Sequence, residues 1–140
     1  MAGSLLGKSI LPRGSAYNGI APDARLAFTD LARSDFYDEL NPISTDLAPY
    51  FRWAYDLGAR VHSDSWGSTE PRYSSLSRDA DAFIHAHDDL ASVFAAGNDG
   101  DEATNLPSTI GDPANAKNVI AVGATRGPDP GEPSLAHKKN

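Results

Sequence analysis

Short apolar runs separated by amphipathic stretches are the feature that most restricts how this chain can fold. Four such runs cover residues 25–29, 61–65, 92–96 and 118–123. Each has about the length of a buried strand. The last run, which contains "VIAVG", is almost continuously apolar, as strands of a parallel sheet are when both faces are covered. We therefore predict four strands of a largely parallel sheet.

The stretches between these runs have helical periodicity. In "STDLAPYFRWAYDLGA" the apolar positions recur every three or four residues, at Leu47, Tyr50, Phe51, Ala54 and Gly58. A second helix fits residues 76–88. The alternation of strands and helices predicts an α/β fold, with a parallel sheet covered by helices on both faces in three layers. Residues 1–125 form one domain in this interpretation, and the proline-containing residues 126–140 form a loop or disordered tail.

Composition excludes several classes of protein. The length of 140 residues fits one domain, and the net charge of −7 argues against a nucleic-acid or acidic-membrane partner. The absence of cysteine excludes disulfides and thiolate metal sites. No apolar stretch approaches the roughly 20 residues of a membrane span. The only base in "MAGSLLGKSI" follows the apolar residues, an order that does not fit a secretory signal.

Two turns are the best candidates for a functional site. "DSWGS" (64–68) follows the second predicted strand, and "FAAGNDG" (94–100) contains the end of the third. Ligands of open α/β sheets gather at the carboxyl ends of strands, so the two turns would form the walls of a cleft if their strands were neighbours. Asn98 offers two uncharged donors that could stabilise an oxyanion. The alternative is that Asn98 only tolerates a left-handed turn conformation.

Other polar groups give weaker indications. His85 and His87 point away from each other on the predicted helix, and His62 alternates with Val61 in a predicted strand, so we assign all three histidines structural or solvated roles. "NDGDE" lacks the spacing of an EF-hand calcium loop. We therefore predict no metal ligand.

The turns together resemble a known family. The segments "AGSLLG", "GIAPDARL", "GARVHSDSWGS", "SVFAAGNDG" and "PANAKNVIAVGAT" have the order and spacing found in subtilisin-like serine proteases, the subtilases or peptidase S8 family. The resemblance covers residues 1 to 125 and implies a partial subtilisin-like fold. It implies that Asn98 is the oxyanion-hole asparagine. It also implies that the substrate is held by two segments: Ser65, Trp66 and Gly67 on one side, and Ala95, Ala96 and Gly97 on the other.

The chain also departs from this family. Subtilases use an aspartate in a D-[ST]-G turn, a histidine in H-G-T-H-V-A-G and a serine in G-T-S-M-A, and none of these motifs occurs here. By the resemblance, the histidine would precede Met1 and the serine would follow the last residue. We therefore expect a fragment of a serine endopeptidase that is inactive alone.

The resemblance also bears on partners and location. It implies an extended peptide or protein as the substrate, with no nucleic acid and no membrane as partner. It implies no organic cofactor; relatives bind structural calcium, but the ligands here are unknown because residues 8–19 offer few carboxylates. The parent family is extracellular, whereas the location of this chain stays open. The alternatives are a non-catalytic peptide-binding pseudo-protease module and a non-proteolytic flavodoxin-like domain.

Overall fold

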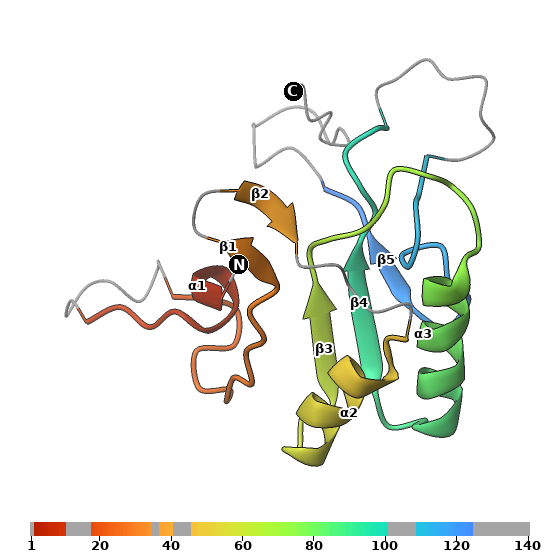
Figure 1. Ribbon diagram of the computed structural model, residues 1–140. Coiled ribbons are helices and arrows are strands. Elements are labelled where there is room, and N and C mark those ends of the chain that lie inside the picture. The colour runs from red at the N-terminus through yellow and green to blue at the C-terminus, as the bar shows by residue number, and fades with distance from the viewer. Residues whose placement is uncertain (1, 11–17, 35–36, 41–45, 101–108, 125–140) are drawn as a thin grey trace, which may run out of the picture.

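The computed structural model describes residues 2–10, 18–34, 37–40, 46–100 and 109–124 (Figure 1). Its elements follow in chain order: α1 (Ala2–Leu6), β1 (Ala32–Ser34), β2 (Tyr37–Leu40), α2 (Ala48–Asp56), β3 (Val61–Asp64), α3 (Ser75–Ala86), β4 (Ala91–Ala95) and β5 (Ile120–Val122). β1 and β2 form a separate antiparallel pair. The predicted tail lies outside the described residues.

A parallel sheet with strand order β3-β4-β5 is the centre of the structure. Val61 pairs with Ala91 and Asp64 with Phe94 between β3 and β4, whereas Val93 pairs with Ile120 between β4 and β5. Three of the four predicted strands are therefore confirmed: β3 and β5 are one and three residues shorter than predicted, and β4 is shifted by one residue. The α/β class with a parallel sheet is also confirmed.

Helices α2 and α3 pack together on one face of this sheet. The rings of Phe51 on α2 and Phe83 on α3 stack with centroids 5.3 Å apart. On the same face lies Phe94 of β4, which is fully buried. The core between helices and sheet consists of Leu47, Phe51, Ala80, Phe83, Leu90, Phe94, Ala114 and Ala116. The apolar stripes recognised in the sequence therefore point to where the core forms.

Local residues explain where α3 begins and where α2 ends. Ser74 caps α3, because its hydroxyl accepts a hydrogen bond of 3.0 Å from the Leu76 N–H. At the end of α2 the chain turns at Gly58, whose φ of 95° suits glycine. The Gly58 N–H donates to the carbonyl of Tyr55 at 2.9 Å. Gly58 thus acts as the predicted stop.

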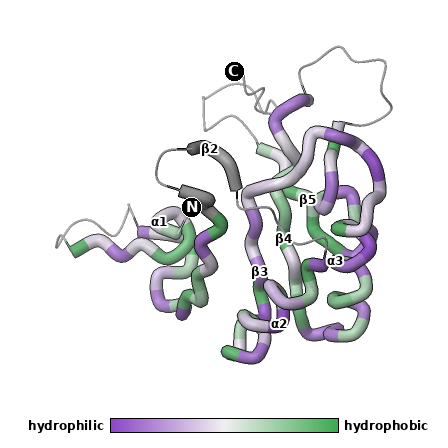
Figure 2. Tube along the Cα trace, in the orientation of Figure 1, coloured by the Kyte–Doolittle hydropathy of each residue, from purple (hydrophilic) through white to green (hydrophobic). Residues whose placement is uncertain are grey.

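The other face of the sheet is apolar and open within the described residues. Val61, Ile120 and Val122 point to this side and are 68%, 53% and 49% exposed. Figure 2 shows the hydrophobic character of β4 and β5. Among the described helices, α2 and α3 pack on the sheet, and both cover the face that carries Phe94. The predicted helical layer on the face of Val61, Ile120 and Val122 therefore stays a prediction.

The prediction of a strand at residues 25–29 is wrong. These residues lie beside the sheet without joining it, and no strand is assigned between residues 24 and 31 (Figure 1). Leu26 and Phe28 are 53% and 66% exposed. A strand needs a hydrogen-bonded neighbour, and the described part of the chain provides none for this segment. An apolar run of strand length is therefore not sufficient to make a strand.

Candidate functional site

The two candidate turns leave the same edge of the sheet. β3 and β4 are adjacent and parallel, and Asp64, the last residue of β3, pairs with Phe94. The chain therefore continues into residues 65–68 and 96–100 at the same carboxyl edge (Figure 1). The neighbouring strands that the cleft hypothesis required are confirmed. That the two turns form one groove stays a prediction.

Asn98 is exposed on the turn after β4. Gly97, and not Asn98, takes the left-handed conformation there, with a φ of 103°; no non-glycine residue in the described part of the chain has a positive φ. The alternative in which Asn98 serves only to adopt that conformation is therefore wrong. Ala95 is exposed at the end of β4, and the half-buried Ala96 donates its N–H to the carbonyl of Val122 at 3.0 Å. The turn is thus tied to β5, with the Asn98 side chain in solvent.

The opposite segment combines exposed residues with an anchored ring. Ser65 and Gly67 are exposed, whereas Trp66 is half-buried. The Trp66 ring meets Phe94 edge-on with centroids 5.7 Å apart. Its Nε1–H donates to Oδ1 of Asp64 at 2.9 Å. The ring therefore fixes the segment to the core while its neighbours stay accessible.

Asp112 joins three segments around this site, although no motif in the sequence indicates it. The residue is only 6% exposed. Its carboxylate accepts hydrogen bonds from the hydroxyls of Ser68 and Ser74, and its carbonyl accepts from the Ser68 N–H at 2.8 Å. A Cβ on the neighbouring Gly111 would come within 1.8 Å of the Ser68 carbonyl oxygen. The chain before β5 thus packs closely against the end of the 65–68 segment.

Replacing Asp112 with alanine should destabilise the fold. The substitution removes the acceptor of two hydroxyls, one of which belongs to the Ser74 cap of α3. We expect a loss of about 1–3 kcal/mol in the free energy of unfolding, and a smaller loss for Asp112→Asn, which keeps one acceptor oxygen. Urea unfolding followed by circular dichroism measures both. The exposed Asp88→Ala is the control, and an Asp112→Ala protein as stable as that control would contradict this role.

A second carboxylate holds the chain just before β5. Asp81 on α3 accepts hydrogen bonds from the backbone N–H groups of Lys117 and Asn118 at 3.1 and 2.7 Å. The hydroxyl of Tyr73 donates to it at 2.7 Å. Partial burial acts to raise the pKa of Asp81, but these bonds favour its charged form more strongly and the pKa lies below its usual value. The same hydrogen bond raises the pKa of Tyr73.

Of the three histidines in the described residues, two are packed against aromatic rings and one is exposed. His87 stacks on Phe83 with centroids 4.1 Å apart, and its Nδ1 lies 2.7 Å from the Phe83 carbonyl oxygen. His85 is exposed, and His62 packs edge-on against Phe51. In the part of the chain that the structure describes, no group of three or more histidine and acidic side chains is placed to hold a metal ion.

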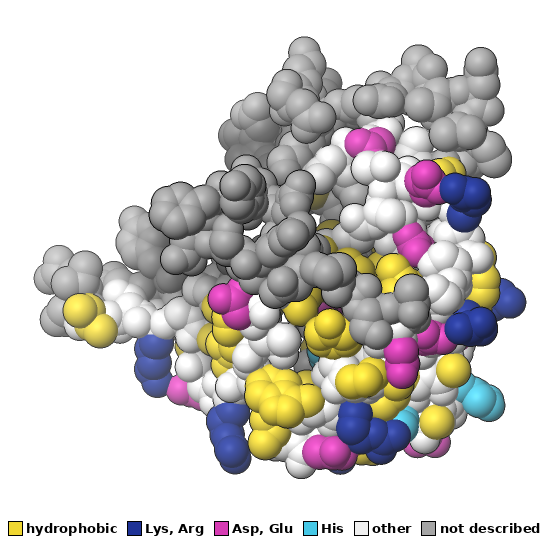
Figure 3. Space-filling model, viewed as in Figure 1, with side chains coloured by type: hydrophobic (Ala, Val, Ile, Leu, Met, Phe, Trp, Pro, Cys, Tyr) yellow, Lys and Arg dark blue, Asp and Glu magenta, His cyan; other side chains and the backbone are white. Residues whose placement is uncertain are grey.

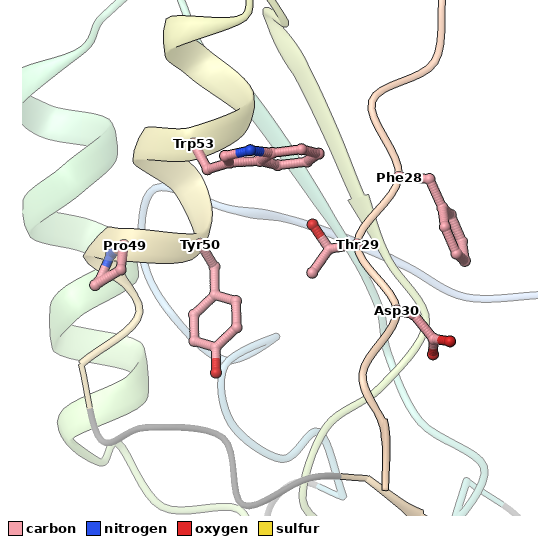
Figure 4. Close-up of a pocket in the computed structure, with 6 residues that line it drawn as sticks. All are labelled: Phe28, Thr29, Asp30, Pro49, Tyr50 and Trp53. Atoms are coloured by element: carbon pink, nitrogen blue, oxygen red, sulfur yellow. The ribbon is translucent and has the colours of Figure 1, made fainter. Parts of the chain in front are cut away.

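A pocket lies away from the two turns. It has a volume of about 420 Å³ and is lined by Phe28, Thr29, Asp30, Pro49, Tyr50 and Trp53 (Figure 4). On the face seen in Figure 3, apolar side chains gather over α2 beside the N-terminal segment. None of the candidate site residues lines this pocket.

None of the described helices is long and apolar enough to cross a membrane.

Comparison with known proteins places this arrangement in a family. A sequence model of the subtilase family, peptidase S8, matches residues 1–135. Two proteins of Dictyostelium discoideum, the serine protease/ABC transporter B family proteins tagD and tagB, are 38% and 39% identical to this chain over 115 residues. Each match covers 79% of this chain. A third, tagA, is 29% identical over 130 residues, or 91% of the chain. The chain spans 6% to 7% of the length of these relatives.

Proposed function

The chain belongs to the subtilase family, and we propose that residues 1–125 are the central part of a serine endopeptidase domain that hydrolyses peptide bonds through an acyl-enzyme. Family membership supports a protease-type function. The curated relatives in the comparison carry the words serine protease in their names.

In this proposal Asn98 donates a hydrogen bond to the oxyanion of the tetrahedral intermediate. The observation that carries it is the conformation of the turn after β4. Gly97 adopts the left-handed conformation of this turn, so Asn98 is not required for it. Asn98 is exposed at the carboxyl edge of the sheet. A neutral donor on a rigid turn stabilises developing negative charge without first pairing with a counter-ion.

The substrate in this proposal is a peptide in extended conformation. It would lie between Ser65, Trp66 and Gly67 on one side and Ala95, Ala96 and Gly97 on the other. The exposure of Ser65 and Gly67 supports this, since extended peptides bind by strand addition through main-chain hydrogen bonds at accessible residues. We propose no organic cofactor, no nucleic-acid or membrane partner, and an extracellular parent enzyme.

A second candidate is a peptide-binding module without catalysis. The sequence feature that favours it is the lack of the D-[ST]-G, H-G-T-H-V-A-G and G-T-S-M-A motifs in the 140 residues. Both candidates share the same peptide groove. The DNA that flanks the coding segment separates them: the first two motifs upstream and the third downstream, in frame, would indicate a protease.

Peptide binding tests the groove that both candidates need. The ¹⁵N-labelled chain is titrated with acetyl-Ala-Ala-Pro-Phe-amide, and its amide chemical shifts are followed by NMR. We expect the shifts to change at residues 65–67 and 95–98, where the backbone is to pair with the peptide. The all-D peptide of the same sequence is the control. Changes confined to residues 28–30 and α2, or no changes, would contradict the proposal.

A further inference from the structure

A chain of hydrogen bonds connects the interior of the domain to Trp66. His62, Asp64 and Trp66 alternate along β3 and just beyond its end, so their side chains share the face that carries the helices. Nδ1 of His62 lies 2.6 Å from Oδ2 of Asp64. The other oxygen of the same carboxylate accepts the Trp66 Nε1–H at 2.9 Å.

The two ends of this hydrogen-bond network, His62 and Trp66, are packed against core rings. His62 meets Phe51 of α2 edge-on with centroids 4.9 Å apart, and Trp66 meets Phe94 of β4 in the same way. The Asp64 side chain is 11% exposed and that of His62 is 19% exposed. Hydrogen bonds to a carboxylate that is shielded from water are strong and directional, so the carboxylate sets the orientation of the indole.

We propose that Asp64 is a positioning residue, which orients the Trp66 ring and thereby fixes the backbone of Ser65–Gly67 for binding an extended peptide. This inference rests on the proposed function of that segment. Asp64 acts through the indole and does not itself touch the peptide. A side chain without an acceptor at this position leaves the indole N–H and the imidazole without their partner, and the ring loses its fixed orientation.

The experiment uses a Trp53→Phe background, in which Trp66 is the only remaining tryptophan. Asp64→Leu replaces both acceptor oxygens with an apolar side chain of similar size, whereas Asp64→Asn keeps one oxygen that can accept from the indole. Asp79→Leu on α3 is the matched control, because the Asp79 side chain is similarly shielded at 17% exposure. The readouts are hydrogen exchange of the Trp66 indole N–H, its fluorescence quenching by acrylamide, and the affinity for acetyl-Ala-Ala-Pro-Phe-amide.

For Asp64→Leu we expect faster indole exchange, stronger quenching and an affinity lower by roughly tenfold, the effect of about one hydrogen bond to a charged group. Asp64→Asn should recover most of the affinity, and Asp79→Leu should match the background protein. Unchanged indole exchange and quenching in Asp64→Leu would overturn the proposal. If the unsubstituted chain does not bind the peptide, the proposed function fails, while the indole measurements still decide whether Asp64 orients the ring.

A double-mutant cycle keeps the test decisive if Asp64→Leu does not fold. Trp66→Phe retains an aromatic ring against Phe94 but has no N–H to donate. If Asp64 acts through that N–H, Asp64→Ala, which removes both acceptor oxygens without adding bulk, should lower the affinity less in the Trp66→Phe protein than in the protein with Trp66. Equal losses on Asp64→Ala in the two proteins would show that the residues act independently and would overturn the proposal.

Discussion

The 140-residue chain should show no serine-protease turnover. The sequence lacks the three motifs that supply the aspartate, histidine and serine of subtilases. In subtilisin, removal of all three residues lowers kcat by about 2 × 10⁶-fold, which leaves only the contribution of the oxyanion hole and substrate binding. An exposed Asn98 can stabilise an oxyanion only after a nucleophile has attacked. We therefore expect the rate of peptide hydrolysis to lie at background.

Casein and a fluorogenic peptide are suitable substrates for this measurement. Subtilisin, diluted until it is just detectable, calibrates the sensitivity of the assay. A serine-directed phosphonate identifies any contaminating protease. Hydrolysis that copurifies with the chain, is blocked by the phosphonate and leaves a phosphonylated serine within residues 1–140 would contradict the prediction and reveal a nucleophile outside the family motifs.

Local patterns in the sequence predicted the centre of the fold well. The apolar runs at 61–65, 92–96 and 118–123 became β3, β4 and β5, and the helical stripes placed Phe51 and Phe83 in the core. The run at 25–29 is also rich in apolar residues but does not join the sheet. Whether a run becomes a strand depends on the neighbour that pairs with it, and the composition of the run does not contain that information.

The candidate site was predictable only in part, for a similar reason. The positions of residues 65–67 and 95–98 followed from the resemblance and from the rule about strand ends. Asp112 contacts Ser68 across 44 positions in the sequence, so no local motif indicates it. Asp64 was visible in "DSWGS", but its link to His62 and Trp66 depends on both side chains sharing one face and being shielded from water. Residues that support a site are therefore found from contacts more readily than from motifs.

Asn98→Ala should lower kcat by about 10²–10³-fold in the full product of the reading frame that contains residues 1–140, provided that this product carries the triad. That range comes from removal of the oxyanion-hole asparagine of subtilisin, the worked case for such a donor. The amide bonds to the substrate oxygen mainly once negative charge develops there. The loss should therefore appear in kcat and in kcat/KM by similar factors, with little change in KM.

Steady-state kinetics with a peptide p-nitroanilide measures this effect. Asp99→Asn, at the neighbouring position of the same turn, is the control and should retain most of the activity, because it leaves the Asn98 donor in place. Asn98→Asp keeps the shape of the side chain but replaces the donor with a carboxylate, so it should be at least as impaired as Asn98→Ala. If Asn98→Ala instead raised KM at constant kcat, Asn98 would act in substrate binding alone, and the assignment of the turn after β4 to the oxyanion hole would be wrong.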